Sequence, residues 1–105
     1  MRRIAFALLM VLPTSALGSA DLRDFVGYTI IAKKTVAGYI DKDGKKEDSF
    51  EGCDYGRVIV FDDDTYVRCQ SYGYQYAYRP DAVVLVNGAS AKMIVENDTY
   101  DVSLR

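Results

Sequence analysis

Histidine is absent from this 105-residue sequence. The chain therefore lacks the usual general base, the commonest metal ligand and the side chain that ordinarily changes charge near neutral pH. No serine lies in the G-x-S-x-G setting of an activated nucleophile, and most carboxylates fall in turn-like segments. Glu51 and Asp54, on either side of Cys53 in a glycine-flanked bend, form the one acidic pair that suits hydrolysis. We therefore expect a protein that is not an enzyme and holds no cofactor or metal, with hydrolysis by this pair as an alternative.

Long apolar segments are absent after residue 20. The longest apolar run, residues 4–12, follows a short basic start and precedes small residues that include Gly18 and Ala20. Nine residues cannot cross a hydrocarbon core that needs about 20, whereas these three regions are those of a secretory signal peptide. The sequence predicts a signal peptide over 1–20, with cleavage after Gly18 as the alternative, and one small domain over 21–105. The domain is expected in the periplasm or secreted, with no membrane attachment after cleavage.

Clusters of basic residues are missing as well. Of the 13 lysines and arginines, two belong to the predicted signal peptide, which leaves 11 against 15 acidic side chains and a net charge of −4. Nucleic acids and anionic membranes favour clustered lysine and arginine, so neither is an expected partner. The acidic segments 41–48 and 62–64 are better explained as solvated turns than as cation sites, because their carboxylates do not match a calcium loop. They are also candidate contacts for a basic protein partner.

Cysteine is scarce, and the two that are present allow a single intramolecular pair, Cys53–Cys69. A domain of this size buries only about 60–65% of its unfolded surface, and small exported domains often add a disulfide. We therefore expect one disulfide, in an oxidising compartment.

This disulfide constrains the hairpin predicted around residues 57–70. If Phe61 faces Tyr66 across a four-residue turn, then Val58 faces Cys69, and the other cysteine lies beyond the reach of a disulfide along a straight strand. A disulfide therefore requires the chain at 52–56 to fold back over the hairpin, which the two glycines of this segment permit.

No segment after residue 20 has a convincing helical apolar period. Short β-like runs recur instead, and 25–32 with 35–40 form either two strands or one long strand bent at the intervening lysines. Asn87-Gly88 indicates a type I′ hairpin. About six or seven short strands predict an all-β fold, a small antiparallel barrel or sandwich of the SH3-like or OB-like kind. The expected strands cover 25–32, 35–40, 57–61, 66–70, 82–86, 92–95 and 99–104.

Tyrosine, in contrast, is plentiful, with nine in the chain. Tyr72, Tyr74, Tyr76 and Tyr78 alternate strictly and end beside Arg79; we call these four residues the tyrosine row. On an extended chain they point to one side, over a length of about 20 Å. These residues and Arg79 are the candidate ligand-binding residues, because tyrosine combines a large apolar body with a polar tip.

Whether the row faces the core or solvent depends on the strand before it. Val67 and Cys69 are the apolar members of that strand and should point inward. Continuing the alternation directs the tyrosine row outward, unless a bulge at Ser71 or Gly73 reverses it. We expect a partly exposed row.

These features predict an exported, non-enzymatic binding or structural module that contacts cell-envelope glycan or peptide through the tyrosine row. The alternative is an interaction or inhibitor domain that docks on a cell-wall or host enzyme. No feature of the sequence names the ligand, the partner or the oligomeric state.

Overall fold

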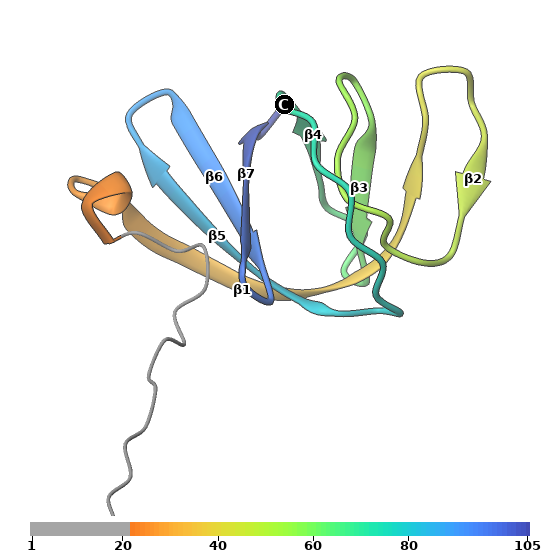
Figure 1. The fold of residues 1–105 in the computed structure, drawn as a ribbon, viewed down its shortest axis with the longest axis horizontal. Coiled ribbons are helices and arrows are strands. Elements are labelled where there is room, and N and C mark those ends of the chain that lie inside the picture. The colour runs from red at the N-terminus through yellow and green to blue at the C-terminus, as the bar shows by residue number, and fades with distance from the viewer. Residues whose placement is uncertain (1–21) are drawn as a thin grey trace, which may run out of the picture.

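The computed structural model describes residues 22–105, which contain seven antiparallel strands and one short 3₁₀-helix (Figure 1). Six strands close into a barrel in the order β1-β3-β4-β7-β6-β5, because β5 pairs back with β1, and β2 extends the sheet beyond β1. The predicted small antiparallel β-barrel is therefore confirmed, whereas the predicted signal peptide lies outside the described residues. The elements are η1 (Leu22–Phe25), β1 (Thr29–Ile40), β2 (Lys46–Glu47), β3 (Val58–Phe61), β4 (Tyr66–Cys69), β5 (Asp81–Asn87), β6 (Ser90–Val95) and β7 (Asp98–Ser103).

β1 is the longest strand and runs along the whole barrel (Figure 1). Its first half pairs with β5 and its second half with β3 and β2, with register shifts at Ile30/Ala32 and Val36/Gly38. Such bulges bend a strand and increase its twist, so one long strand is confirmed over the two-strand alternative, but the predicted bend at the lysines is wrong, because Lys33 and Lys34 pair regularly with β5. The predicted start at residue 25 is wrong, because η1 and Gly27, at φ 87°, precede the strand.

The β3–β4 hairpin differs from the predicted register by one residue. Val60 faces Tyr66 and Val58 faces Arg68, whereas Phe61 was expected opposite Tyr66. The turn is shorter than expected because Asp64 adopts a left-handed φ of 71°, and the N–H of Phe61 donates to the carbonyl of Thr65 at 2.8 Å.

The β5–β6 hairpin also departs from its predicted turn. Asn87 pairs with Ser90, so the two turn residues are Gly88 and Ala89. Only Gly88 has a positive φ, 61°. A type I′ turn needs positive φ at both central positions, whereas type II′ needs it only at the first, so the predicted type I′ turn at Asn87-Gly88 is wrong. The turn expected within 41–48 is present as the connection of the β1–β2 hairpin, with the N–H of Asp41 bonded to the carbonyl of Lys45 at 2.8 Å.

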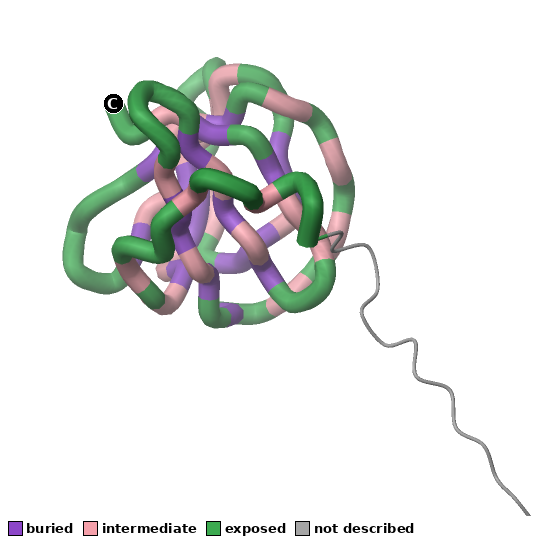
Figure 2. The backbone as a smooth tube through the Cα atoms, turned by 90° about the vertical axis from the view of Figure 1, so that its left-hand side faces the viewer, coloured by how far each residue is buried: buried purple, intermediate pink, exposed green. Residues whose placement is uncertain are grey.

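The core fills the interior of the barrel, where the buried residues of Figure 2 gather. Phe50, Phe61, Ile59 and Met93 are its largest fully buried side chains. The rings of Phe50 and Tyr100 meet edge to face, with centroids 5.7 Å apart, a favoured aromatic geometry.

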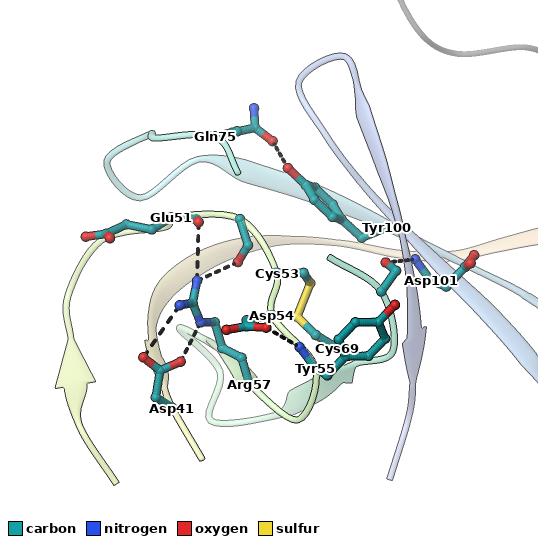
Figure 3. The surroundings of a disulfide bond; sticks show 12 residues. Asp41, Glu51, Cys53, Asp54, Tyr55, Arg57, Cys69, Gln75, Tyr100 and Asp101 are labelled. Carbon is teal, nitrogen blue, oxygen red and sulfur yellow. Dashed lines mark hydrogen bonds and ion pairs between the residues drawn. A yellow bond between two sulfur atoms is a disulfide. The ribbon is translucent and has the colours of Figure 1, made fainter. Parts of the chain in front are cut away.

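Cys53 and Cys69 form the predicted disulfide, with Cα atoms 5.5 Å apart (Figure 3). The chain before β3 folds back over the hairpin as that disulfide requires. Gly52 and Gly56 have φ values of 83° and 84°, which glycine adopts without the penalty of a side chain. The N–H of Gly56 then bonds the carbonyl of Cys69 at 3.1 Å.

Candidate functional site

The tyrosine row lies on the outside of the barrel. Its four side chains are 60–68% exposed, and the residues between them, Gly73, Gln75 and Ala77, are half-buried. The inward alternation of Val67 and Cys69 therefore continues through the row without a reversing bulge, and the expectation of an exposed row is confirmed.

The row belongs to an extended segment between β4 and β5 that is fixed on one side (Figure 1). Gly73 exchanges two backbone hydrogen bonds with Cys53, at 2.8 and 3.0 Å, and Ala77 exchanges two with Phe50, both at 2.9 Å. We call 50–53 the backing segment. Gly52 lies so close to the row that a Cβ there would overlap the carbonyl oxygen of Gly73.

Arg57 fastens the backing segment to the barrel (Figure 3). Its Nη1 donates to the carbonyl oxygens of Glu51 and Gly52, both at 3.2 Å. Its Nε donates to Asp41 Oδ1 at 2.6 Å, and its guanidinium carbon lies 4.1 Å from the centroid of the Tyr39 ring. Burial, and then the charge of Glu51, raises the pKa of Tyr39, so this hydroxyl stays neutral beside the ion pair.

Tyr100 of β7 supports the row from inside. Its hydroxyl donates to Gln75 Oε1 at 2.6 Å (Figure 3), and a methyl group on Gly73 would lie 3.1 Å from its Cε1 atom. Burial raises the pKa of Tyr100, and the negative charges of Asp98 and Glu96 add to the effect. The hydroxyl is therefore a neutral donor throughout the physiological range.

A groove of about 290 Å³ runs between the row and β7, lined by Tyr72–Tyr74 and Asp98–Tyr100. We call this groove the seam. The seam opens because β4 and β7 pair only at Arg68–Ser103 and Cys69–Val102. Past these pairs the two chains separate, and the Tyr100 side chain fills the space between them in place of further ladder pairs. Thr99, which also lines the seam, has a buried Oγ1 atom without a hydrogen-bond partner among the described residues.

The seam residues of β7 were missed as site residues in the sequence. Tyr100 fits an ordinary inward position of an alternating strand, and Asp98 fits a turn. Only the divergence of two strands far apart in the sequence brings them to the row.

Arg79, the remaining candidate residue, is exposed and has a φ of 48°. The extended backbone therefore ends at Arg79, and the alternation of the row ends with it. The carbonyl of the next residue, Pro80, accepts a hydrogen bond from the N–H of Val36 at 2.8 Å.

The carboxylates of Glu51 and Asp54, the candidate hydrolytic pair, do not point toward one another. The Glu51 carboxylate points away from the disulfide, and Asp54 Oδ1 accepts the N–H of Tyr55 at 2.8 Å (Figure 3). In the acidic turn 62–64, Asp63 is bound by the ammonium of Lys34 at 2.6 Å. Within residues 22–105, no group of three acidic or cysteine side chains is arranged to hold a metal ion.

A larger hollow of about 590 Å³ lies along the β1–β2 hairpin and Val60. Its one aromatic residue, Tyr39, is only 4% exposed, so this hollow offers no aromatic surface comparable to the row.

No helix in the described part of the chain is long and apolar enough to span a membrane. No protein-family model, curated protein or solved structure matches the sequence or fold of this chain.

Proposed function

We propose that this protein is an exported, non-enzymatic binding module of the periplasm or the extracellular space, which holds a component of the cell envelope against the tyrosine row. The main support is the exposure of all four rings, 60–68%, on a segment whose other side is bonded to the barrel. The disulfide supports export, because disulfides persist in oxidising compartments.

The shape of the row favours an extended ligand, either a glycan strand or a peptide. Alternate residues of an extended chain are about 6.6 Å apart, so the four rings offer repeated contacts along one line. Tyrosine loses little rotamer entropy on binding, and the backing segment holds the row in place before a ligand arrives, which reduces the cost of ordering it.

A docking role for the acidic turns has less support. Asp41 is paired with Arg57 and Asp63 with Lys34, so part of the charge in 41–48 and 62–64 is already neutralised. Binding to a basic protein that weakens strongly with salt, without any effect of row substitutions, would favour this alternative.

The test compares Tyr74→Ser/Tyr76→Ser with Tyr55→Ser/Tyr66→Ser, in which the replaced residues are also exposed, 59% and 45%, but lie outside the row. Soluble β-1,4-linked N-acetylglucosamine oligosaccharides and a pool of short synthetic peptides serve as probes in titration calorimetry. We expect the row variant to bind at least tenfold more weakly, an order-of-magnitude figure for lost aromatic contacts, and the control to bind normally. Both variants should melt like the wild type, because exposed substitutions change stability by about 0.5 kcal/mol or less. Binding that does not depend on the row would overturn the proposal.

A further inference from the structure

We propose that the ligand is an extended peptide carrying a lysine or arginine, which adds as a strand to the free backbone edge of the tyrosine row and places its cationic side chain in the seam beside Asp98. This inference rests on the proposed function and names the ligand class for the same surface.

The row has an unpaired backbone edge. Gly73 and Ala77 direct their N–H and C=O groups toward the backing segment, where four hydrogen bonds hold them. Neighbouring residues of an extended chain direct these groups to opposite sides, so the N–H and C=O groups of Tyr72, Tyr74 and Tyr76 face away from the backing segment. None of them is hydrogen-bonded within residues 22–105. Such an edge is a template for another strand.

On the opposite wall of the seam, the backbone edge of β7 that faces the row is also unpaired at Thr99 within residues 22–105. The carbonyl of Asp101 accepts a hydrogen bond from the N–H of Gln70 at 2.8 Å, and the N–H of Asp101 donates to Ser71 Oγ at 3.1 Å. Two residues earlier, Thr99 directs its N–H and C=O to the same side, but the β4–β7 ladder has ended at Cys69–Val102. The backbone groups of Thr99 thus face the seam from the β7 side, as those of the tyrosines do from the row, and the buried Oγ1 atom of Thr99 has no hydrogen-bond partner within residues 22–105. Strand addition satisfies groups of this kind, with main-chain hydrogen bonds for affinity and pockets for alternate side chains.

The charge of the seam selects a basic side chain. Asp98 lines the seam, and Glu96 lies close to it, with its Oε1 atom 3.4 Å from Nε2 of Gln75. Asp98 and Tyr100 line the same groove; burial raises the pKa of Tyr100, and the charges of Asp98 and Glu96 raise it further, in keeping with an acidic seam. The rings of Tyr72 and Tyr74 flank the same space, and aromatic faces attract cations.

The other occupants fit less well. A neutral glycan supplies neither a cation for Asp98 nor the regular backbone amides that match the edge. A second copy would bring a chain with a net charge of −4 after signal removal against an acidic seam. The seam volume, about 290 Å³, is at the lower limit of small-molecule pockets, which begin at about 300 Å³. It therefore suits one side chain and its adjoining backbone.

The experiment selects peptides from a displayed library of random eight-residue sequences with one fixed central lysine, and from a matched library with a fixed glutamate. The best peptide is then synthesised and titrated against the wild type, Asp98→Asn and Asp62→Asn. We expect lysine peptides to be selected and Asp98→Asn to weaken binding about tenfold. Asp62→Asn should have no effect, because it removes the same charge from the exposed β3–β4 turn.

Backbone methylation separates strand addition from side-chain contact alone. Methylating alternate peptide amides should abolish binding for one set and be tolerated for the other, because only one edge of an added strand faces the row. If neither set matters while Tyr74→Ser/Tyr76→Ser still weakens binding, strand addition is overturned and the proposed function stands.

Four other results would overturn part or all of the inference. If only oligosaccharides bind, and they bind through the row, the inference of a peptide ligand is overturned and the proposed function stands. If neither oligosaccharides nor peptides bind, both the inference and the proposed function are overturned. An unchanged affinity of Asp98→Asn overturns the placement of the cation. A wild-type dimer in sedimentation that Tyr74→Ser/Tyr76→Ser dissociates would show that a second copy occupies the edge, and would also overturn the inference.

Discussion

Replacing Arg57 by methionine should cost at least about 3 kcal/mol of folding free energy. The Arg57 side chain is only 13% exposed, and it joins three parts of the molecule. It pairs with Asp41 beyond the end of β1, donates to two carbonyls of the backing segment and stacks on Tyr39. Methionine keeps much of the apolar stem and removes every polar contact.

The magnitude follows from these contacts. A hydrogen bond to a charged group contributes about 1.5–3 kcal/mol, and the two carbonyls share one nitrogen at 3.2 Å, so we count them as one such bond. The Asp41 side chain is 26% exposed and regains water when its partner is lost, which leaves about 1 kcal/mol from the ion pair. Stacking on Tyr39 adds roughly 0.5–1 kcal/mol. A folded unit the size of residues 22–105 has a total stability of about 4–13 kcal/mol, so the loss is a large share of it.

Urea unfolding and thermal melting measure this effect. A loss of about 3 kcal/mol lowers the melting temperature of a domain of this size by roughly 12–24 °C. Arg68→Met is the matched control, because Arg68 is half-buried on β4 and makes no ion pair or hydrogen bond through its side chain within residues 22–105. Amide exchange at Gly73 and Ala77 should accelerate in the Arg57 variant, because their hydrogen bonds depend on the backing segment.

A cost below about 1 kcal/mol, the value of a surface ion pair, would refute this account of Arg57. So would a cost equal to that of the Arg68 control. A double-mutant cycle with Asp41→Asn separates the ion pair from the carbonyl contacts, with an expected coupling of about 1 kcal/mol.

Two further predictions test other supports of the row, and a third tests an ion pair of the β3–β4 turn. Replacing Cys53 and Cys69 by serine should cost about 3 kcal/mol, seen as a urea midpoint equal to that of the reduced wild type; an unchanged midpoint would contradict it. Gly52 and Gly44 both have positive φ, so replacing either by alanine should cost about 1–3 kcal/mol for the left-handed backbone. Gly52→Ala should cost clearly more than Gly44→Ala, because only Gly52 has no room for a Cβ. Equal costs would argue against the close approach of Gly52 to the row. A hydrogen bond from lysine holds the pKa of Asp63 below its usual value, so its stabilisation is present above about pH 4 and is lost as the pH falls further. The stability difference between wild type and Asp63→Asn should therefore narrow below pH 4, and a difference that is constant down to pH 2 would contradict the pairing.

Alternation and disulfide geometry explain why much of the site was predictable. Side-chain alternation is rigid along an extended chain, so the inward positions of Val67 and Cys69 determined the outward direction of the row. The short reach of a disulfide required a fold-back of the chain, and the glycines at 52 and 56 marked where it occurs.

Turn geometry was less predictable because it depends on single backbone conformations. Three consecutive aspartates do not show which one adopts a left-handed φ, and the choice of Asp64 moved the β3–β4 register by one residue. Asn87-Gly88 is a strong turn signal, but the pairing of Asn87 with Ser90 shifted the turn by one position.

The seam could not be predicted because it results from how β4 and β7 separate. Gly73 admits the Tyr100 ring, and Gln75 accepts its hydroxyl hydrogen bond at 2.6 Å. This side-chain contact lies where further β4–β7 ladder pairs would continue the barrel wall, and within residues 22–105 no backbone hydrogen bond joins the row to residues 98–100. The contact also holds Gln75 inward and therefore keeps its tyrosine neighbours outward. The Tyr100–Gln75 contact thus reinforces the outward direction that alternation from Val67 and Cys69 sets, and it lies where the β4–β7 ladder has ended and the free backbone edge begins.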